Sequence, residues 1–304
     1  MKKESFDPGL TTQFSGELRR TINPDGSFNV RREGLRWRDA NPYLMLIGTT
    51  WPRFLLLVAT GFLLVNVIFA CLYLMIGIEH LKGLESDMSA FANAFFFSFH
   101  TLTTVGYGNV YPEGTWANVI SSIEAATGLM VFAIATGLLY GRFSRPSARI
   151  VYSKSAIIAP YQDGNSLQFR VTNARTNVLM NMEARVMLMT VDSTDGVLKR
   201  SFVDLALERR GVYFFALTWT IVHPIDSDSP LFGKTREELA KVSAELLILI
   251  QGFDDTFSQV VHSRYSYRHD EMIWGAKFIP AFKVDPKGDM VVEVNRIDEM
   301  KLIG

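Results

Sequence analysis

Apolar residues are concentrated before residue 142, in two long runs with a shorter one between them. The first run, residues 55–78, contains no Asp, Glu, Lys, Arg or His, and the second, residues 116–140, contains only Glu124. Each run is long enough to cross a hydrocarbon core of about 30 Å. Residues 90–102 are mostly apolar and rich in phenylalanine, but too short to span. The pattern predicts two transmembrane helices with a short re-entrant helix between them.

After residue 150 the long runs give way to short stretches in which apolar and polar residues alternate, as in half-buried strands. Strands are predicted around residues 167–171, 182–188, 199–206, 212–222, 244–251, 264–268 and 291–296. Asp195-Gly196 is a hairpin-turn signal, and Thr235 with Glu238 forms a capping-box pattern that opens a short helix over residues 235–242. We therefore expect an all-β domain, an immunoglobulin-like β-sandwich.

The chain just before the first long run mixes aromatic and aliphatic side chains with Arg36 and Arg38. This mixture predicts an amphipathic helix over residues 35–50 that lies at the membrane interface, with Trp51-Pro52 breaking it from the first span. The alternative is a short soluble helix packed on the β-domain.

The domain organisation follows from these patterns. Residues 1–29 are polar, and we expect them to be poorly ordered. The expected parts are an N-terminal segment over residues 1–34, the interfacial helix over 35–50, a membrane domain over 51–150 and a regulatory β-domain over 151–304.

Basic residues flank the two apolar runs on their outer sides, whereas the connecting segment carries Lys82 against four acidic residues. The flanking basic residues are Arg31, Arg32, Arg36, Arg38, Arg53, Arg142, Arg145, Arg149 and Lys154. The positive-inside rule then predicts a multi-pass protein of the cell (inner) membrane with both termini in the cytoplasm.

The short apolar stretch leads directly into the string Thr101-x-Thr103-Thr104-Val105-Gly106-Tyr107-Gly108. Its Thr-Val-Gly-Tyr-Gly part is the known filter sequence of K⁺ channels, so the identification is a motif match. The two glycines permit backbone angles that turn successive carbonyls to the same side. Val105 and Tyr107 are expected to point away from these carbonyls, into packing that holds the loop.

This string lies between two predicted membrane helices, which raises its weight above that of a bare Gly-Tyr-Gly turn. It predicts that the short helix is a pore helix over residues 90–102, and that the filter over residues 103–108 coordinates K⁺. The expected ligands are Thr104, Val105, Gly106, Tyr107 and Gly108, with Thr103 as a support.

Three further strings extend the match beyond the filter. They are Arg142-Phe143-Ser144-Arg145-Pro146 after the second run, His223-Pro224-Ile225-Asp226 with Ser229-Pro230-Leu231, and Asp270-Glu271-Met272-Ile273-Trp274-Gly275. With the order of elements, they make nearly the whole chain resemble the inwardly rectifying potassium channels, specifically their prokaryotic (KirBac) branch. We also group the chain broadly with voltage-gated channels.

The resemblance implies a homotetramer in which four chains supply the filter, K⁺ as the permeant ion without any cofactor, and gating through the cytoplasmic domain. It places Phe132 and Tyr140 at the constriction where the inner helices cross, with Phe132 as a hydrophobic gate. Strong rectifiers hold an acidic residue midway down this span, where Mg²⁺ or polyamines block. This chain has Phe132 at the corresponding position, so strong rectification through that site is not expected.

The resemblance also offers lipid sites. Arg36, Arg38, Arg142, Arg145, Arg149 and Lys154 are candidates for binding anionic headgroups or phosphoinositides, which inhibit similar prokaryotic channels. The alternative is that these residues only set the topology.

Glu124 is a costly charge inside a membrane run, which favours a paired or functional role. It is expected either to support the filter or to face the cavity and attract cations, and the remaining alternative is a buried, hydrogen-bonded glutamate. Gly128 and Gly137 on the same run either bend the helix or allow close packing.

Composition excludes several function classes. The 31 basic and 31 acidic residues balance, so nothing favours nucleic acid as a partner. A lone Cys71 allows no intrachain disulfide and is expected to pack within the first span. The sequence has no phosphate-loop or nucleophile motif, so no enzyme is predicted. Two rival interpretations stay open: a membrane-anchored receptor or enzyme whose β-domain carries the function, and a two-span K⁺ channel without rectification.

Overall fold

The structure is a computed structural model that describes residues 9–10, 13–14, 19–34, 41–144, 148–194 and 197–303. The chain divides into two compact units. One runs from Glu33 to Arg145 and is helical, and the other combines the N-terminal segment with the chain from Pro146 onward and is built of β-strands.

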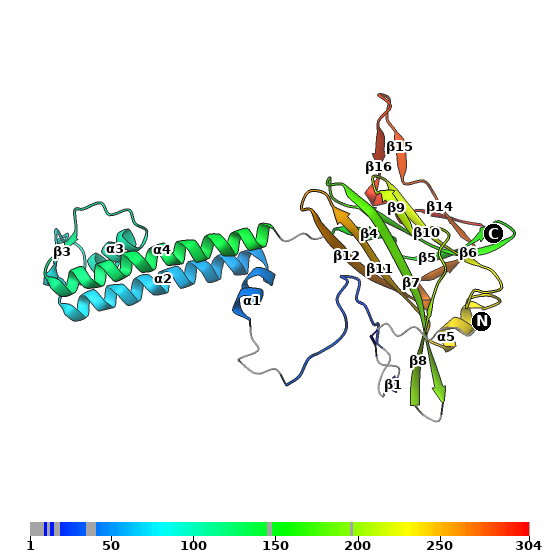
Figure 1. Cartoon of the computed structure of the whole chain (residues 1–304), viewed down its shortest axis with the longest axis horizontal. Helices are drawn as coiled ribbons and strands as arrows, with labels where there is room; N and C mark the ends of the chain where they lie inside the picture. The colour runs from blue at the N-terminus through cyan, green and yellow to red at the C-terminus, as the bar shows by residue number, and fades with distance from the viewer. Residues whose placement is uncertain are drawn as a thin grey trace. The chain divides into compact units, whose positions relative to one another are not determined.

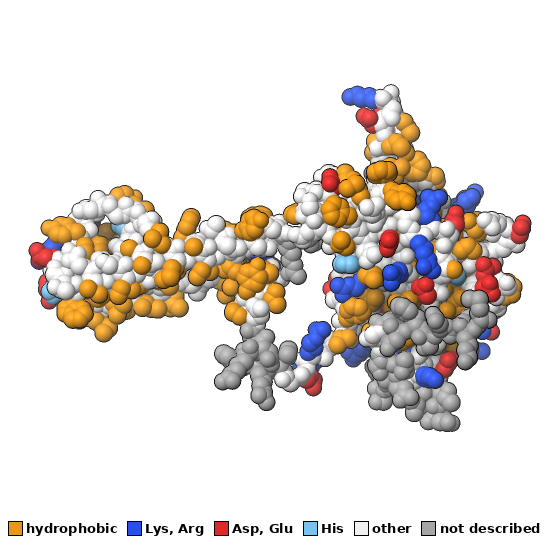
Figure 2. Space-filling view, viewed as in Figure 1, with side chains coloured by type: hydrophobic (Ala, Val, Ile, Leu, Met, Phe, Trp, Pro, Cys, Tyr) orange, Lys and Arg blue, Asp and Glu red, His pale blue; other side chains and the backbone are white. Residues whose placement is uncertain are grey.

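Two long helices dominate the helical unit: α2 (Trp51–Ile76) and α4 (Thr115–Phe143). At 1.5 Å per residue their lengths are about 39 and 43 Å, and both are apolar enough to cross a membrane. Figure 2 shows hydrophobic side chains along this unit, while most charged side chains in view lie on the β-domain. The two predicted spans are confirmed.

Residues 41–50 are the described part of the predicted interfacial helix. The described helix α1 spans Pro42–Gly48 and is capped by Asn41, whose side chain accepts a hydrogen bond from the Leu44 amide at 3.2 Å. Arg36 and Arg38 lie outside the described residues.

The break after α1 differs from the prediction, because it falls at Thr49 and Thr50, both in extended conformation. Trp51 and Pro52 instead begin α2, since proline is tolerated in the first turn of a helix, where its missing N–H has no partner to lose.

The short helix α3 (Ala90–Leu102) has the predicted bounds and is capped by Ser89. The loop before it contains η2 (Ile78–His80) and β2 (Leu81–Lys82), and the loop after the filter string contains β3 (Tyr111–Pro112). β2 and β3 pair antiparallel, so the two ends of the re-entrant segment are held together. Gly83 makes this possible: a Cβ there would lie 1.8 Å from the Asn109 carbonyl oxygen.

Close packing joins α4 to the end of α3. Gly128 is buried, and a Cβ on it would lie 2.1 Å from the Leu102 carbonyl oxygen. Of the two roles considered for this glycine, close packing is therefore the one observed, whereas a Cβ on Gly137 would meet nothing within 4 Å. Cys71 is exposed on α2 rather than packed within the chain.

The β-domain consists of two main sheets (Figure 1). The six-stranded sheet has the order β1 (Gln13–Phe14), β8 (Val197–Asp204), β7 (Leu179–Thr194), β11 (Glu245–Asp254) and β12 (Gln259–Arg268), with β9 (Gly211–Phe214) also paired to β7. The five-stranded sheet has the order β10 (Thr218–Ile225), β6 (Gly164–Asn173), β5 (Ala156–Tyr161) and β13 (Met272–Trp274), with β4 (Ile150–Tyr152) also paired to β6.

One core of buried residues joins the two sheets, as the alternation predicted. Its members include Leu167, Phe169 and Val171 from β6, Met182, Ala184, Val186 and Leu188 from β7, and Leu246, Ile248 and Ile250 from β11. The prediction that the chain combines two membrane helices with an all-β domain is confirmed. Thr194 pairs with Val197, so β7 and β8 form a hairpin, and the predicted turn Asp195-Gly196 lies outside the described residues.

Two predicted strands differ from the structure. Residues 212–222 form parts of β9 and β10, with Phe215 buried between them. The stretch 291–296 is divided between β16 (Met290–Val292) and the single turn η4 (Val294–Arg296).

The remaining elements are α5 (Arg236–Lys241), which has the predicted capping box, η3 (His269–Glu271), β14 (Ala276–Phe278), β15 (Phe282–Val284) and β17 (Met300–Leu302).

Part of the N-terminal segment that was expected to be poorly ordered packs on the β-domain. Ile22 is buried, and the Arg20 guanidinium forms an ion pair with Glu271 at 2.8 Å. The amide and hydroxyl of Thr21 donate to the buried carboxylate of Glu245. Polar composition misled the prediction, because these polar groups bind partners on the domain instead of water.

Candidate functional site

The backbone φ angles along the filter string alternate between positive and non-positive values. Thr104, Gly106 and Gly108 have φ values of +60°, +52° and +80°, whereas the intervening Val105 and Tyr107 do not have positive φ. The left-handed region costs a residue with a Cβ about 1–2 kcal/mol, so Thr104 is held there by its surroundings. Such alternation turns successive carbonyls toward one side.

Hydrogen bonds fix the amides of this segment against the end of α3. The Val105 and Gly106 amides both donate to the His100 carbonyl, at 3.0 and 3.2 Å, and the Thr104 amide donates to the Thr101 carbonyl at 3.0 Å. The Thr103 hydroxyl donates to the Phe99 carbonyl at 2.7 Å, which ties the start of the segment to the last turn of α3. Among the described residues, no donor reaches the carbonyls of residues 104–108, so these oxygens are free to bind a cation.

One chain does not enclose this row of oxygens. Val105 and Tyr107 are 52% and 72% exposed, and a Cβ on Gly106 or Gly108 would meet nothing within 4 Å. The prediction that the Val105 and Tyr107 side chains pack behind the filter is therefore met within the chain only in part, by the Tyr107 ring, which lies 4.8 Å from the His100 ring.

Glu124 is wholly buried among α2, α3 and α4. Its carboxylate accepts hydrogen bonds from the Tyr73 hydroxyl at 2.6 Å and from the Ser98 hydroxyl of α3. The Ser98 oxygen also lies 3.2 Å from both the carbonyl and the side-chain oxygen of Asn66. Within one chain, Glu124 thus sits in the paired position behind the pore helix and is not exposed toward a cavity.

Phe132 and Tyr140, the two predicted gate residues, are 74% and 73% exposed on α4. Large apolar side chains that no neighbour in the chain covers face either lipid or further protein copies. The structure does not bring these two rings together, since they lie about two helical turns apart.

Comparison with known proteins identifies the chain. A family model for the inward rectifier potassium channel C-terminal domain matches residues 150–303, and an ion channel model matches residues 55–145. The inward rectifier potassium channel Kirbac3.1 of Paramagnetospirillum magnetotacticum is 36% identical over 92% of this chain and 95% of its own length. The chain belongs to the inward rectifier potassium channel family.

A more distant relative supports the same assignment. The ATP-sensitive inward rectifier potassium channel 12 of Gallus gallus is 25% identical over 90% of this chain and 71% of its own length. Among solved structures, that of the sporulation control protein Spo0M of Bacillus subtilis matches over 42% of this chain and 50% of its own chain. The identity is 9% and the TM-score is 0.24, so this likeness carries no argument about the fold or the function. The relatives are ion channels rather than enzymes, and the voltage-gated grouping does not match them.

Arg142 occupies a place in this inward rectifier that the sequence did not reveal. Its guanidinium donates to the carbonyls of Leu46, Ile47 and Thr49 at 2.7, 3.2 and 2.8 Å, so it caps the end of α1 from the last turn of α4. The same group stacks on the Trp51 ring at 4.5 Å. A headgroup would have to compete with these contacts.

The other lipid candidates are placed differently. Arg149 is exposed, and the Lys154 ammonium is exposed with its nitrogen 3.4 Å from Asp298. Arg145, like Arg36 and Arg38, lies outside the described residues. Arg149 and Lys154 are therefore the described candidates whose charges face solvent.

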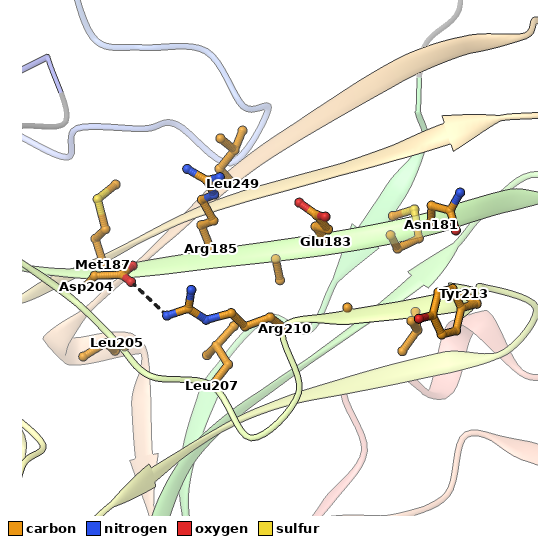
Figure 3. A pocket seen from close by; sticks show the side chains of 14 residues that line it. Asn181, Glu183, Arg185, Met187, Asp204, Leu205, Leu207, Arg210, Tyr213 and Leu249 are labelled. Carbon is orange, nitrogen blue, oxygen red and sulfur yellow. Dashed lines mark ion pairs between the residues drawn. The ribbon is translucent and has the colours of Figure 1, made fainter.

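The β-domain of this inward rectifier carries a surface pocket of about 990 Å³ (Figure 3). Charges of both signs line it, including Glu183 and Arg185, and Arg210 forms an ion pair with Asp204 at 3.5 Å. Sequence reasoning did not single out these residues, which read as the solvent side of alternating strands. In the described part of the chain, no three His, Cys, Asp or Glu side chains are grouped so that they could hold a metal ion.

His223, from one of the strings that carried the resemblance, is buried and structural. Its Nδ1 lies 2.6 Å from the Ala206 carbonyl and its Nε2 lies 2.8 Å from the Ser229 hydroxyl. Burial lowers the pKa of the imidazole below its usual value, against the raising effects of the Ala206 carbonyl and Asp226.

Proposed function

We propose that four copies of this chain assemble around one axis and conduct dehydrated K⁺ through their joined filter segments. The observation that carries the proposal is the free row of carbonyls between Thr104 and Gly108, on a backbone of alternating hand. Four such rows replace the water shell of a K⁺ ion, whereas one row leaves most of it in place. The relatives named as potassium channels support the same conclusion.

The proposed setting is the inner membrane of the cell, with both termini in the cytoplasm. The excess of Arg and Lys outside the two spans supports this orientation, and the filter then faces the outside. The α3 helix directs its carbonyl end toward the filter, where its dipole favours a cation.

The proposed gate is the ring that four copies of Phe132 form, with Tyr140 as a second ring. An apolar ring of that kind blocks hydrated ions because water leaves it. Arg149 and Lys154 are the proposed contacts for anionic lipids, including phosphoinositides. Mg²⁺ or polyamine block is expected to be weak, because Phe132 offers no charge to a blocker, and this would make the chain a poorly rectifying member of its family.

Uptake of radioactive Rb⁺ into liposomes that contain the purified protein tests the proposal. Liposomes with wild-type protein should accumulate Rb⁺ when they are loaded with K⁺, because K⁺ leaving through the channel drives Rb⁺ inward. They should not accumulate it when they are loaded with Na⁺, and Ba²⁺ should block the uptake. Gly106→Ala should abolish it, because a Cβ opposes the φ of +52° at that position.

Gly61→Ala is the matched control, since its Cβ would enter open space on α2, and it should behave as wild type. Wild-type liposomes without K⁺-selective uptake, or a stable active monomer by light scattering, would refute the proposal.

A further inference from the structure

His100 is a residue that neither the motif nor the predicted site includes, yet it touches the filter at two separate points. It lies in the last turn of α3 and is partly buried. Its carbonyl oxygen accepts the amides of Val105 and Gly106, and its imidazole lies 4.8 Å from the Tyr107 ring at an interplanar angle of 87°.

These two contacts bracket the least constrained part of the filter. Gly106 has φ +52° and no side chain, and a Cβ there would meet nothing within 4 Å, so no steric contact within the chain fixes its position. What holds the backbone on either side of its carbonyl is therefore the His100 carbonyl at its amide and the His100 ring at the next residue.

The platform that carries His100 is itself rigid. Two residues earlier, Ser98 is hydrogen-bonded to Glu124 of α4, and two residues later the carbonyl of Leu102 lies against Gly128. A contact made from a helix fixed on both sides holds its target to a narrower range of positions than one made from a loop.

We propose that the His100 side chain is a positioning residue for ion selectivity, which sets the place of the Tyr107 ring and thereby the spacing of the carbonyls at Gly106 and Tyr107. The inference rests on the proposed conduction of K⁺ through this segment. A perpendicular pair of flat rings has a preferred separation, so it resists both widening and narrowing of the filter. Removing the His100 ring frees Tyr107 to move. The spacing of the carbonyl oxygens at Gly106 and Tyr107 then varies more, and the filter admits Na⁺ more readily.

The test compares Rb⁺ uptake in liposomes under a K⁺ gradient and under a Na⁺ gradient for four proteins. His100→Ala should lower the K⁺-over-Na⁺ preference by about tenfold while uptake under the K⁺ gradient and the amount of tetramer stay near wild type. His100→Phe should restore most of the preference, because it returns a flat ring against Tyr107. Phe96→Ala is the matched control: it removes an exposed ring from the same helix whose ring contact is with Phe95, and it should leave the preference unchanged.

The outcomes separate the inference from the function it rests on. A wild-type preference in His100→Ala, or a preference that His100→Phe does not restore, would overturn the role of the ring while leaving conduction intact. Wild-type protein without any K⁺ preference would instead refute the proposed function. Should His100→Ala not assemble, His100→Leu fills a similar volume without a flat ring and should show the same loss of preference.

Discussion

The hydrogen bonds of Glu124 allow the cost of breaking the contact behind the pore helix to be worked out. In Glu124→Ala the Tyr73 hydroxyl loses its acceptor in a fully buried place, which costs about 1–3 kcal/mol. The Ser98 hydroxyl has one proton to donate and can turn to Asn66, 3.2 Å away, so it adds little. The vacated volume adds about 1 kcal/mol or more. The expected loss is roughly 2–4 kcal/mol in each subunit.

Glu124→Gln is the matched comparison. The amide has nearly the same shape, its oxygen accepts from Tyr73, and its nitrogen donates to the Ser98 oxygen, so the loss should stay below about 1 kcal/mol. Because α3 leads directly into the proposed filter, the alanine variant should lose both tetramer stability and K⁺-selective uptake, while the glutamine variant keeps most of both.

The measurement is the fraction of tetramer that survives heating in detergent, read by size-exclusion chromatography, alongside Rb⁺ uptake. The reasoning fails if the tetramers of both variants dissociate at the same temperature as wild type, since losing the acceptor of the Tyr73 hydroxyl would then cost no stability. It also fails if Glu124→Gln is as damaging as Glu124→Ala, because the charge rather than the hydrogen bonds would then matter.

Three further outcomes are expected. Gly128→Ala should disrupt uptake, because its Cβ would lie 2.1 Å from the Leu102 carbonyl, a backbone atom that cannot move aside; wild-type uptake would argue against close packing. Phe132→Ser should raise resting Rb⁺ uptake more than Tyr140→Phe does, with selectivity kept, and unchanged uptake would make Phe132 a packing residue. Because burial lowers the pKa of His223, the unfolded chain binds the proton first, and thermal stability should fall as pH drops below about 6.5; His223→Gln should flatten that fall, and equal slopes would contradict it.

The sequence predicted the elements whose signal is local. The bounds of α3 and the core positions of β6 and β7 follow from apolar spacing alone, and the capping box at Thr235 follows from two residues. The filter could be predicted because the chemistry expected of it resides in consecutive backbone groups, so a contiguous string can specify it.

The features that were missed depend on contacts between distant parts of the chain. Arg142 reads as one more positive charge beside a membrane, and only the fold shows it capping α1 from 93–96 residues away. The sequence likewise did not predict that residues 19–29 pack on the β-domain, because the buried Glu245 that accepts a hydrogen bond from Thr21 lies 224 residues further along the chain. His100 carried no signal, since the sequence does not show that its ring lies against the ring of Tyr107, seven residues further along the chain.

Two tight contacts hold α4 at separate points along its length. At the first, Gly128 packs against the carbonyl of Leu102; at the second, Gly141 lies close to Tyr43 and Arg142 donates to the carbonyls at the end of α1. No residue between these two contacts is fully buried. Within one chain, the stretch between these two contacts, residues 129–140, is where we expect α4 to flex, and it carries both Phe132 and Tyr140. If Phe132 and Tyr140 form the proposed gate, movement there would leave the end of α3 anchored at Gly128, so the passage would open and close at one end while the ion-sorting end keeps its dimensions.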